Sequence, residues 1–471
     1  MDYWTIALQI ATVLALGYYY LSRKYTYWKD RGITGPPPTL AFGNLWDLLR
    51  HGQVKKELEW VKKYGKTYGM YQGFVPSPSF TTGKLKGMHG LMNRAVEKLG
   101  TYFDNQIAKS NGEMNIKEVI TGFTVDVIAS TSFATDTNTN GDRSGSNVFL
   151  ENSIGLLDFK AWILLSFFAM PKRFNRLVGA ELGFNMKPFQ FFVDLSKAII
   201  RQRQTEKDNK IKRTDLVQLM LDAFIYEDEL QEKNYDKLTA TADNDEHLEV
   251  DKKSNTAEGS IRRQLSENEI VAQCILFFVA GFETTATTLS NALYQLAIHP
   301  EKQSILAEEL RQALDGVEVD SAEYFDKVNN HIPYLEATIK ETLRMCPPVT
   351  RLQRRVGVDG YKLGGQPLEK DTHVDLAVYA VHHSAEYYED PDTFQPERFL
   401  PENKHKLVPY TYLPFGAGPR NCIGMRFAYQ EIRLCLAKIV RDFAFATTPK
   451  TKVPLEYNKF GLLSCKDIPL K

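Results

Sequence analysis

Residues 415–424 read Phe415-Gly416-Ala417-Gly418-Pro419-Arg420-Asn421-Cys422-Ile423-Gly424, which places one cysteine behind a glycine-rich loop. The next stretch, 425–443, is dominated by apolar residues and lacks both glycine and proline, so it predicts a largely buried helix. Cys422 then precedes the start of a helix, where unpaired N–H groups and the positive end of the helix dipole favour an ionised sulfur. A buried structural cysteine is the alternative, because a free cysteine usually behaves as a small hydrophobe. The ten-residue spacing favours a thiolate aimed at a metal.

The other residues of this loop suit a thiolate that binds haem iron. Gly416, Gly418 and Gly424 lack a Cβ, so they allow unusual torsions and let the backbone approach a flat macrocycle closely. Arg420 lies two residues before the sulfur and can pair with a haem propionate as a fork-shaped donor. An axial cysteinate donates electron density to the iron, which promotes cleavage of an O–O bond. The loop thus predicts a haem-thiolate site with Cys422 as the axial ligand.

A polar interruption occurs inside a second apolar stretch, residues 266–298. There Ala280-Gly281-Phe282-Glu283-Thr284-Thr285 follows a run of five apolar residues. Gly281 permits the close approach of a ligand, and the hydroxyl of Thr284 can bond back to the carbonyl four residues earlier, which loosens the helix. Such a groove can hold dioxygen and water, so we expect Thr284 to relay protons and Glu283 to supply them. A threonine-rich helix that packs against another helix is the alternative.

Two shorter motifs carry charged side chains. Glu341-Thr342-Leu343-Arg344 lies in the helical stretch 333–345, and its i,i+3 spacing puts the carboxylate and the guanidinium on one face. Alone this motif is weak evidence, because an exposed pair of this kind contributes little. Pro396-Glu397-Arg398-Phe399 supplies another arginine further along the chain.

With these motifs, the chain resembles the cytochrome P450 family of haem-thiolate monooxygenases. The cysteine loop of that family has the form Phe-x-x-Gly-x-Arg-x-Cys-x-Gly, and its long helix carries Ala-Gly-x-Glu-Thr. Every specified position is met here. The resemblance runs from about Trp28 to the C-terminus, with one interruption. It is greatest to the microsomal branch, which contains vertebrate drug- and steroid-oxidising enzymes and insect detoxification enzymes. It implies a mainly α fold with small β-sheets (α+β), preceded by one N-terminal transmembrane helix.

The resemblance also implies roles for individual residues. Thr284 and Glu283 would be catalytic, and Cys422 would bind the iron of haem b. The further cofactor contacts would come from Arg420, Phe415, Gly416, Arg354, Ala280 and Gly281. Glu341, Arg344 and Arg398 would form a buried three-way network that supports the cysteine loop. Two more arginines flank Arg354, at positions 351 and 355, so the register of the propionate contact stays open.

The bulk composition excludes several classes of protein. The chain of 471 residues has a net charge of +0, which offers no general attraction to nucleic acid, since binding there normally needs a basic patch. Its five cysteines lie far apart, with no CxxC pair and an odd total, which argues against a disulfide framework or a zinc site. For His382-His383 we expect a loop or strand role and not a metal site, because adjacent residues of a strand point to opposite faces and the sequence offers no second ligand cluster. We expect the catalytic body to face a reducing compartment.

The N-terminal residues 3–22 predict a membrane anchor. They contain no charged residue and can just span a bilayer as a helix. A cleaved signal peptide is the alternative, but the basic residues follow the apolar run, at positions 23, 24, 29 and 31, so the body would face the cytosol. We expect an anchor in residues 1–24, an aromatic flank and proline hinge in 25–38, and a single catalytic domain in 39–471. The predicted location is the endoplasmic reticulum membrane.

Several other segments have recognisable patterns. Helices are expected at 54–64, 87–100 and 116–133, a strand at 67–74, and a mobile charged loop at 227–260. Ser266-Glu267-Asn268-Glu269 matches a capping box that opens the long helix, and His299-Pro300 ends it. The apolar region 156–192 is either core packing or a lid that contacts lipid and substrate.

The chain departs from the family after Phe74. Val75-Pro76 leads directly to residues 77–86, which resemble the segment that follows a Trp-x-x-x-Arg helix in family members, and none of the five tryptophans can occupy that place. Several dozen residues are thus absent after about residue 75, through a skipped exon, a faulty gene model or a genuine short form. An open pocket would admit water, whereas shielding of reactive intermediates requires its exclusion.

The sequence therefore predicts an oxidoreductase that inserts one oxygen atom from dioxygen into an apolar small molecule, such as a xenobiotic, a steroid or a fatty-acid-like compound. Electrons would come from NADPH through a flavoprotein reductase, with cytochrome b5 as a second candidate partner. Arg426, Arg433 and Arg441 form either a docking face for that reductase or an ordinary solvated face. The alternative function is a haem-binding relative whose catalysis is impaired by the missing segment. A haem-thiolate isomerase is disfavoured, because it would be expected to lack Thr284.

Overall fold

The computed structural model describes most of the chain after residue 88 and part of the region before it. The described residues are 34–37, 44–64, 89–133, 135–139, 147–157, 185–205, 215–221, 224–226, 262–459 and 461–471. Several expectations fall outside them: the anchor in 1–24, the strand at 67–74, the junction after Phe74, the loop at 227–260 and most of the apolar region 156–192.

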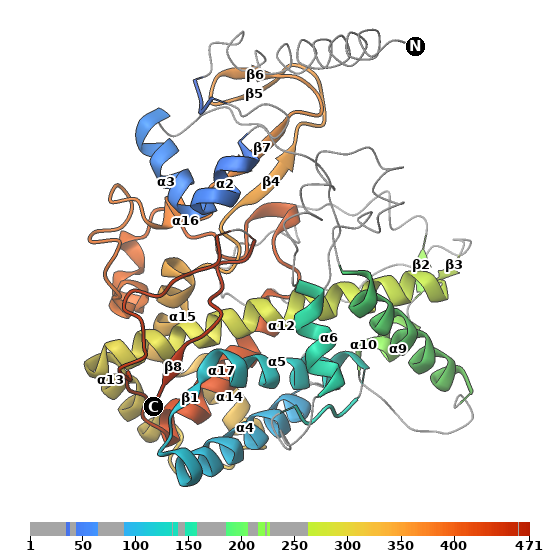
Figure 1. The fold of residues 1–471 in the computed structure, drawn as a ribbon, viewed down its shortest axis with the longest axis vertical. Helices are drawn as coiled ribbons and strands as arrows, with labels where there is room; N and C mark the ends of the chain where they lie inside the picture. The colour runs from blue at the N-terminus through green and yellow to red at the C-terminus, as the bar shows by residue number, and fades with distance from the viewer. Residues whose placement is uncertain are drawn as a thin grey trace, which may run out of the picture.

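Helices make up most of the described structure (Figure 1). Those of the first part are α2 (Leu45–His51), α3 (Gln53–Tyr64), α4 (His89–Ser110), α5 (Ile116–Phe133), α6 (Val148–Leu157), α9 (Met186–Thr205) and α10 (Leu216–Leu221). Those of the second part are α12 (Glu267–Ile298), α13 (Pro300–Ala313), α14 (Ala322–Asn330), α15 (Pro333–Met345), α16 (Val378–His382) and α17 (Met425–Asp442). Short 3-10 helices lie between α16 and α17: η5 (Pro396–Phe399), η6 (Pro401–Lys406) and η7 (Gly418–Arg420).

The strands that the structure describes pair two by two, always antiparallel. The pairs are β1 (Met114–Asn115) with β8 (Pro469–Leu470), β2 (Phe224–Tyr226) with β3 (Arg262–Gln264), β4 (Leu352–Arg355) with β7 (His373–Leu376), and β5 (Tyr361–Leu363) with β6 (Gln366–Leu368). Over the described ranges, the prediction of a mainly helical fold with small sheets is confirmed.

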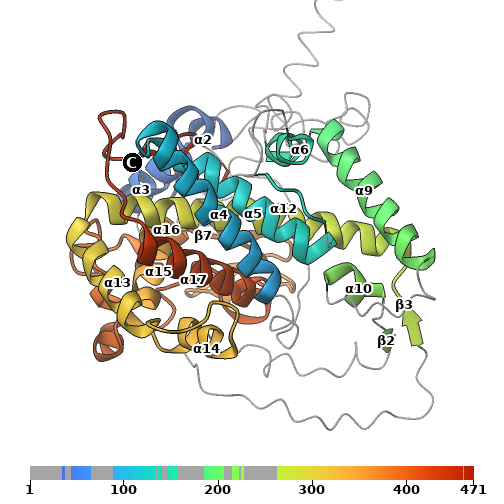
Figure 2. The ribbon, with the colours of Figure 1, turned by 90° about the horizontal axis from the view of Figure 1, so that it is seen from below.

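The long helix α12 crosses the molecule and organises it (Figures 1 and 2). Its predicted capping box is present: the Ser266 hydroxyl accepts from the N–H of Glu269, whose carboxylate accepts from the N–H of Ser266. The helix ends before Pro300, which cannot continue it and begins α13. Within the described residues, α12 is the helix long and apolar enough to cross a membrane, but half of its most apolar window is buried inside the protein. It is therefore placed as a core helix here.

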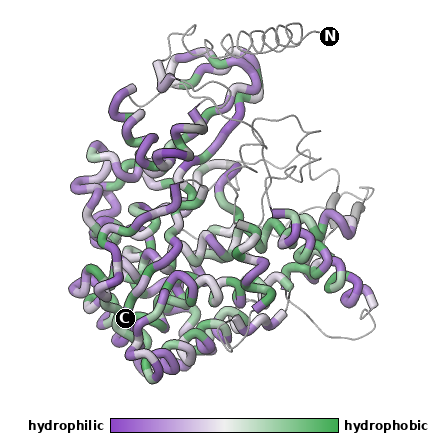
Figure 3. The backbone as a smooth tube through the Cα atoms, viewed as in Figure 1, coloured by the Kyte–Doolittle hydropathy of each residue, from purple (hydrophilic) through white to green (hydrophobic). Residues whose placement is uncertain are grey.

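Two clusters of buried apolar side chains flank α12. The larger one joins α4, α5, α13, α15 and α17 to the second half of α12. The smaller one joins α5, α6, α9 and α10 to the first half, where the rings of Phe192 and Phe278 lie 4.2 Å apart. In Figure 3 hydrophobic segments concentrate around α5, α6 and α12, whereas α2, α3, β4 and β7 are more hydrophilic. The core thus lies along α12, below the β4–β7 and β5–β6 pairs in Figure 1.

Two predictions of local structure are wrong. The helix expected to end at Gly100 continues to Ser110, because Leu99 and Phe103 on either side of the glycine are buried in the core and hold the helix together. His382, for which a loop or a strand was expected, is the last residue of helix α16. The helices expected at 54–64, 116–133, 333–345 and 425–443 agree with α3, α5, α15 and α17 to within one residue at each end.

Candidate active site

Cys422 lies three residues before α17, at the end of a tight loop. Its N–H donates to the carbonyl oxygen of Phe415 at 2.7 Å, which closes the loop between the two residues. Gly416 and Gly418 have φ values of +74° and +75°, a left-handed conformation that favours glycine. Cys422 is exposed, whereas the other four cysteines of the chain are buried. The loop therefore presents one thiol at the surface of the fold.

The backbone around this thiol has room for a flat group. A Cβ added at Gly418 would meet no described atom within 4 Å, and one added at Gly424 would meet only the sulfur of Cys422, at 4.0 Å. No cluster of three or more His, Cys, Asp or Glu that could hold a metal occurs within the described part of the chain. An outward thiol on bare glycine backbone fits a haem with a cysteine axial ligand.

The thiol of Cys422 is not pre-ionised by its surroundings. Its pKa is raised above the ordinary cysteine value, because desolvation outweighs the hydrogen bonds from the N–H groups of Gly424 and Met425. Those two groups act in the expected direction, toward a thiolate. Coordination to a metal cation deprotonates a thiol outright, so iron binding would supply what the helix start does not.

Arg354 is the arginine of its cluster that reaches toward the cysteine loop. Its Nη2 lies 3.5 Å from the carbonyl oxygen of Ala417, and its side chain is exposed. The side chain of Arg351 is 7% exposed and pairs instead with the carboxylates of Glu57 and Asp375. Arg354 thus lies beside the loop, and its contact with a propionate stays a prediction.

Phe415 and Arg420 bracket the loop in different ways. The ring of Phe415 packs 5.1 Å from the ring of Tyr429 on α17, which fixes the start of the loop against that helix. Arg420 ends η7 and is exposed. Phe415 therefore anchors the loop, and Arg420 places a cation at the surface of the loop.

One face of α12 is open in the middle of an otherwise buried helix. Leu276 is 42% exposed, Ala280 is exposed and Thr284 is half-buried, and their spacing of four places them on one face. The hydroxyl of Thr284 donates to the carbonyl oxygen of Ala280 at 2.7 Å, which confirms the predicted back-bond. Leu276 extends this face by one turn. Sequence reasoning missed it, because a leucine within an apolar run carries no signal of exposure.

Gly281 lies against another helix. A Cβ at this position would be 2.8 Å from Cδ1 of Ile128 on α5, closer than real Cβ contacts. The missing side chain thus lets α5 and α12 approach each other. Its expected contact with a ligand stays a prediction.

The carboxylate of Glu283 is bound by residues from distant parts of the chain. Its Oε1 accepts from Nζ of Lys117 on α5 and from the hydroxyl of Ser464 near the C-terminus, both at 2.7 Å. A longer contact of 3.4 Å joins it to the hydroxyl of Thr287. Glu283 and Thr284 are thus neighbours in sequence whose side chains have different partners. No sequence pattern links Lys117 to a residue 166 positions away.

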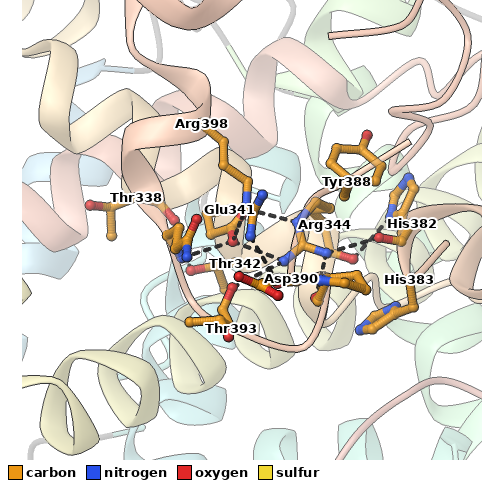
Figure 4. Close-up of polar contacts among 12 residues, drawn as sticks. Thr338, Glu341, Thr342, Arg344, His382, His383, Tyr388, Asp390, Thr393 and Arg398 are labelled. Atoms are coloured by element: carbon orange, nitrogen blue, oxygen red, sulfur yellow. Dashed lines mark hydrogen bonds and ion pairs between the residues drawn. The ribbon is translucent and has the colours of Figure 1, made fainter. Parts of the chain in front are cut away.

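The structure brings Glu341, Arg344 and Arg398 together (Figure 4). Nε and Nη2 of Arg344 donate to the two carboxylate oxygens of Glu341, each at 2.8 Å, and both side chains are fully buried. Nε of Arg398 lies 3.4 Å from Oε1 of the same carboxylate. Nη1 of Arg344 also donates to the carbonyl oxygens of His382 and Pro391, each at 2.8 Å. The network is therefore a buried, bidentate ion pair with added backbone contacts.

His382 connects this network to the cysteine loop. Its Nε2 accepts from the N–H of Leu413 at 2.8 Å, so Nδ1 carries the ring proton and donates to the carbonyl oxygen of Arg344 at 3.0 Å. Burial lowers the pKa of His382 to about 3, so the ring is neutral at pH 7. The carbonyl oxygen of Leu413 accepts from the N–H of Gly416. Sequence reasoning gave this histidine no more than a loop or strand role.

The three arginines of α17 differ in their surroundings. Arg433 pairs with Glu336 at 2.8 Å, and Arg441 pairs with Asp442 at 2.7 Å. Arg426 is exposed. Two of the three cations are thus neutralised within the chain, which weakens the case for a docking face made of all three.

Comparison with known proteins agrees with this geometry. A model of the cytochrome P450 family matches residues 75–470. Cytochrome P450 3A11 of Mus musculus is 32% identical over 96% of this chain and 93% of its own length. Cytochrome P450 3A1 of Rattus norvegicus is 32% identical over 98% and 95%, and cytochrome P450 3A5 of Homo sapiens is 29% identical over 97% and 94%. The first alignment spans 508 positions, more than the 471 residues of this chain, so that relative has residues without a counterpart here.

Together, the thiol loop, the open face of α12 and the buried network define a haem-thiolate enzyme. The chain belongs to the cytochrome P450 family. It is a monooxygenase of the oxidoreductase class, and haem b is its cofactor.

Proposed function

We propose that this monooxygenase is anchored in the endoplasmic reticulum membrane, faces the cytosol, and inserts one oxygen atom from dioxygen into an apolar xenobiotic, steroid or fatty-acid-like molecule. The observation that carries the proposal is the outward thiol of Cys422 on its glycine loop. When bound, haem b supplies the iron at which dioxygen is activated. NADPH provides the electrons through a flavoprotein reductase, with cytochrome b5 as a second partner. The uncharged stretch 3–22 supports the membrane anchor.

Thr284 and Glu283 handle protons in this proposal. The hydroxyl of Thr284 donates its hydrogen bond to the carbonyl oxygen of Ala280. Its oxygen lone pairs can therefore accept a hydrogen bond from water on the open face of α12. The carboxyl of Glu283 supplies protons through that water.

The remaining site residues orient the cofactor and hold its loop. Arg354 and Arg420 bind the propionates, and both side chains are exposed. Phe415, Gly416, Ala280 and Gly281 contact the macrocycle. Glu341, Arg344 and Arg398 support the cysteine loop through His382 and Leu413, as their hydrogen bonds suggest.

The test is spectroscopic. We expect the reduced holoprotein with carbon monoxide to show the red-shifted Soret band of thiolate ligation, and Cys422→Ala to lose it. Cys435→Ala is the matched control, because that buried cysteine lies on α17 away from the loop and its loss should leave the band in place. A band typical of histidine ligation in the parent protein would overturn the assignment.

A haem-binding relative with impaired catalysis is the second candidate. It is favoured by the departure from the family after Phe74. The 508-position alignment to a 471-residue chain and the start of the family match at residue 75 support it. A transcript with a longer reading frame between Phe74 and Ser77, together with reductase-dependent turnover, would exclude this candidate. Rapid NADPH consumption without product by the 471-residue form would favour it.

A further inference from the structure

A buried polar stripe runs along α12 on the side that carries Glu283. Residues 283, 287, 291 and 295 are Glu, Thr, Asn and Gln, and their spacing of four puts them on one face. Lys117 contacts the first two, since its Nζ lies 2.7 Å from Oε1 of Glu283 and 3.3 Å from the hydroxyl of Thr287. Further along, the hydroxyl of Tyr457 donates to Oδ1 of Asn291 at 2.8 Å. The stripe therefore joins α5, α12 and the C-terminal segment.

Lys117 occupies an unfavourable place for a cation. It is 6% exposed and is the second residue of α5, at the helix end whose dipole repels positive charge. Burial lowers its pKa, while the carboxylate of Glu283 acts in the opposite direction. A buried ion pair is weak evidence for stability, because apolar residues of similar volume often do as well. Its position beside a proposed proton-handling residue suggests a role beyond stability.

The two oxygens of the Glu283 carboxylate differ in their hydrogen bonds. Among the described residues, the hydrogen bonds from Lys117, Ser464 and Thr287 all go to Oε1. The side chain is 14% exposed. Oε2 is thus the oxygen left to take up a proton and pass it on, forming and then breaking one O–H bond with no change of oxidation state.

We propose that Lys117 is the positioning residue that holds Oε1 of Glu283 and leaves Oε2 as the oxygen that carries the proton, with Ser464 as the second anchor. This inference rests on the proposed function of Glu283. The other titratable groups that face the pair are Cys465 and, behind it, Cys346 and Tyr457. Burial raises the pKa of Cys465 to about 12 and that of Cys346 to about 11, and the pKa of Tyr457 is also raised by burial. All three are therefore neutral near pH 7, which leaves Lys117, among the residues that the structure describes, as the charge paired with Glu283.

The first test uses the pH profile of coupled turnover in the holoprotein. Lys117→Met removes the cation, so the carboxyl keeps its proton to higher pH, and the limb of the profile that depends on Glu283 should move by about one pH unit toward alkaline values. Lys117→Arg should restore the parent profile, Ser464→Ala should give a smaller shift of the same sign, and Lys117→Met/Glu283→Gln should show no such limb. An unchanged profile in Lys117→Met would overturn the inference.

The matched control is Lys302→Met. Lys302 also pairs with a glutamate, Glu397, at 2.8 Å, but this pair is partly exposed and lies at the start of α13. Its loss should leave the pH profile where it is. A shift as large as that of Lys117→Met would mean that any lysine loss has this effect, which would contradict the assigned role.

The second test needs no turnover, so its failure is separate from failure of the proposed function. In Lys117→Met the folded chain should prefer the protonated carboxyl of Glu283. As the pH is raised from 5 to 8, the thermal midpoint of Lys117→Met should therefore decrease more than that of Lys117→Met/Glu283→Gln. Parallel curves for the two variants would overturn the inference, whatever the Soret test of Cys422 shows.

Discussion

Glu431 is a buried acid in α17. It is 1% exposed, and its Oε1 has no hydrogen-bond partner among the residues that the structure describes. Burial raises its pKa well above the ordinary glutamate value. Cys435, one turn further along α17, is also buried with a raised pKa. The carboxyl is therefore protonated in the folded chain over a pH range in which the unfolded chain is ionised.

The raised pKa of Glu431 predicts that the fold loses stability as the pH rises. The raised pKa means that Glu431 stabilises the fold below its unfolded value of about 4.3, and that this contribution declines as the pH rises toward the folded pKa. Glu431→Gln removes the ionisation. Between pH 5 and pH 8, the free energy of unfolding of this variant should therefore rise relative to that of the parent protein. Urea unfolding at several pH values checks this. A constant difference between the two proteins would contradict it.

Single residues also show where prediction from sequence ends. The roles of Cys422 and Thr284 follow from local spacing, and the back-bond of Thr284 is present as predicted. His382 and Lys117 could not be found this way, because each acts through residues that are 31 to 166 positions away. Such partners become neighbours only when the helices pack.

At the scale of elements, α5 and α12 approach each other closely at one glycine, Gly281. A Cβ at position 281 would be 2.8 Å from Cδ1 and 3.2 Å from Cγ1 of Ile128. Ile128 is 5% exposed and belongs to the smaller apolar cluster, so it has little room to move away. The gain in helix propensity from replacing a glycine, about 1 kcal/mol, is therefore opposed by overpacking.

We expect Gly281→Ala to destabilise the fold by about 1 kcal/mol, because overpacking of a filled core costs about 1–3 kcal/mol. In an Ile128→Ala background, which removes both close carbons, the same substitution should be neutral or stabilising. A double-mutant cycle on the free energy of unfolding measures this coupling. Equal costs in both backgrounds would show that the two helices do not meet through this glycine.

Periodicity and capping predicted most elements well. The capping box at Ser266 and Glu269 marks the start of α12 within one residue. The prediction failed at Gly100, where tertiary packing overrides the low helix propensity of glycine. It also failed at His382, which ends a short helix where a loop or a strand was expected. Local patterns cannot show which faces will be buried by distant elements.

At the scale of the whole molecule, the two apolar clusters share α5 and α12 but little else. The aromatic side chains of the smaller cluster meet at Phe278, whose ring lies 4.2 Å from that of Phe192 and 5.4 Å from that of Phe282. The larger cluster instead centres on α17 and α4. Separate clusters allow parts of one fold to open with different free energies.

Phe278→Ala should therefore weaken one part of the molecule. Removing this buried ring should cost about 3–5 kcal/mol, and hydrogen exchange should speed up in α6, α9 and α10 while α4 and α17 keep their protection. Leu436→Ala, in the larger cluster, is the matched control and should show the reverse pattern. Uniform loss of protection in both variants would mean that the fold opens as a single unit.

The short ladder between β1 and β8 also has a consequence for biosynthesis. Met114 pairs with Leu470, and the carboxylate of Glu283 accepts a hydrogen bond from the hydroxyl of Ser464. During synthesis, α5 and α12 therefore leave the ribosome before the C-terminal residues that complete their contacts. The core can reach its final packing only after residue 470 has left the exit tunnel, so chaperones have a long nascent chain to protect.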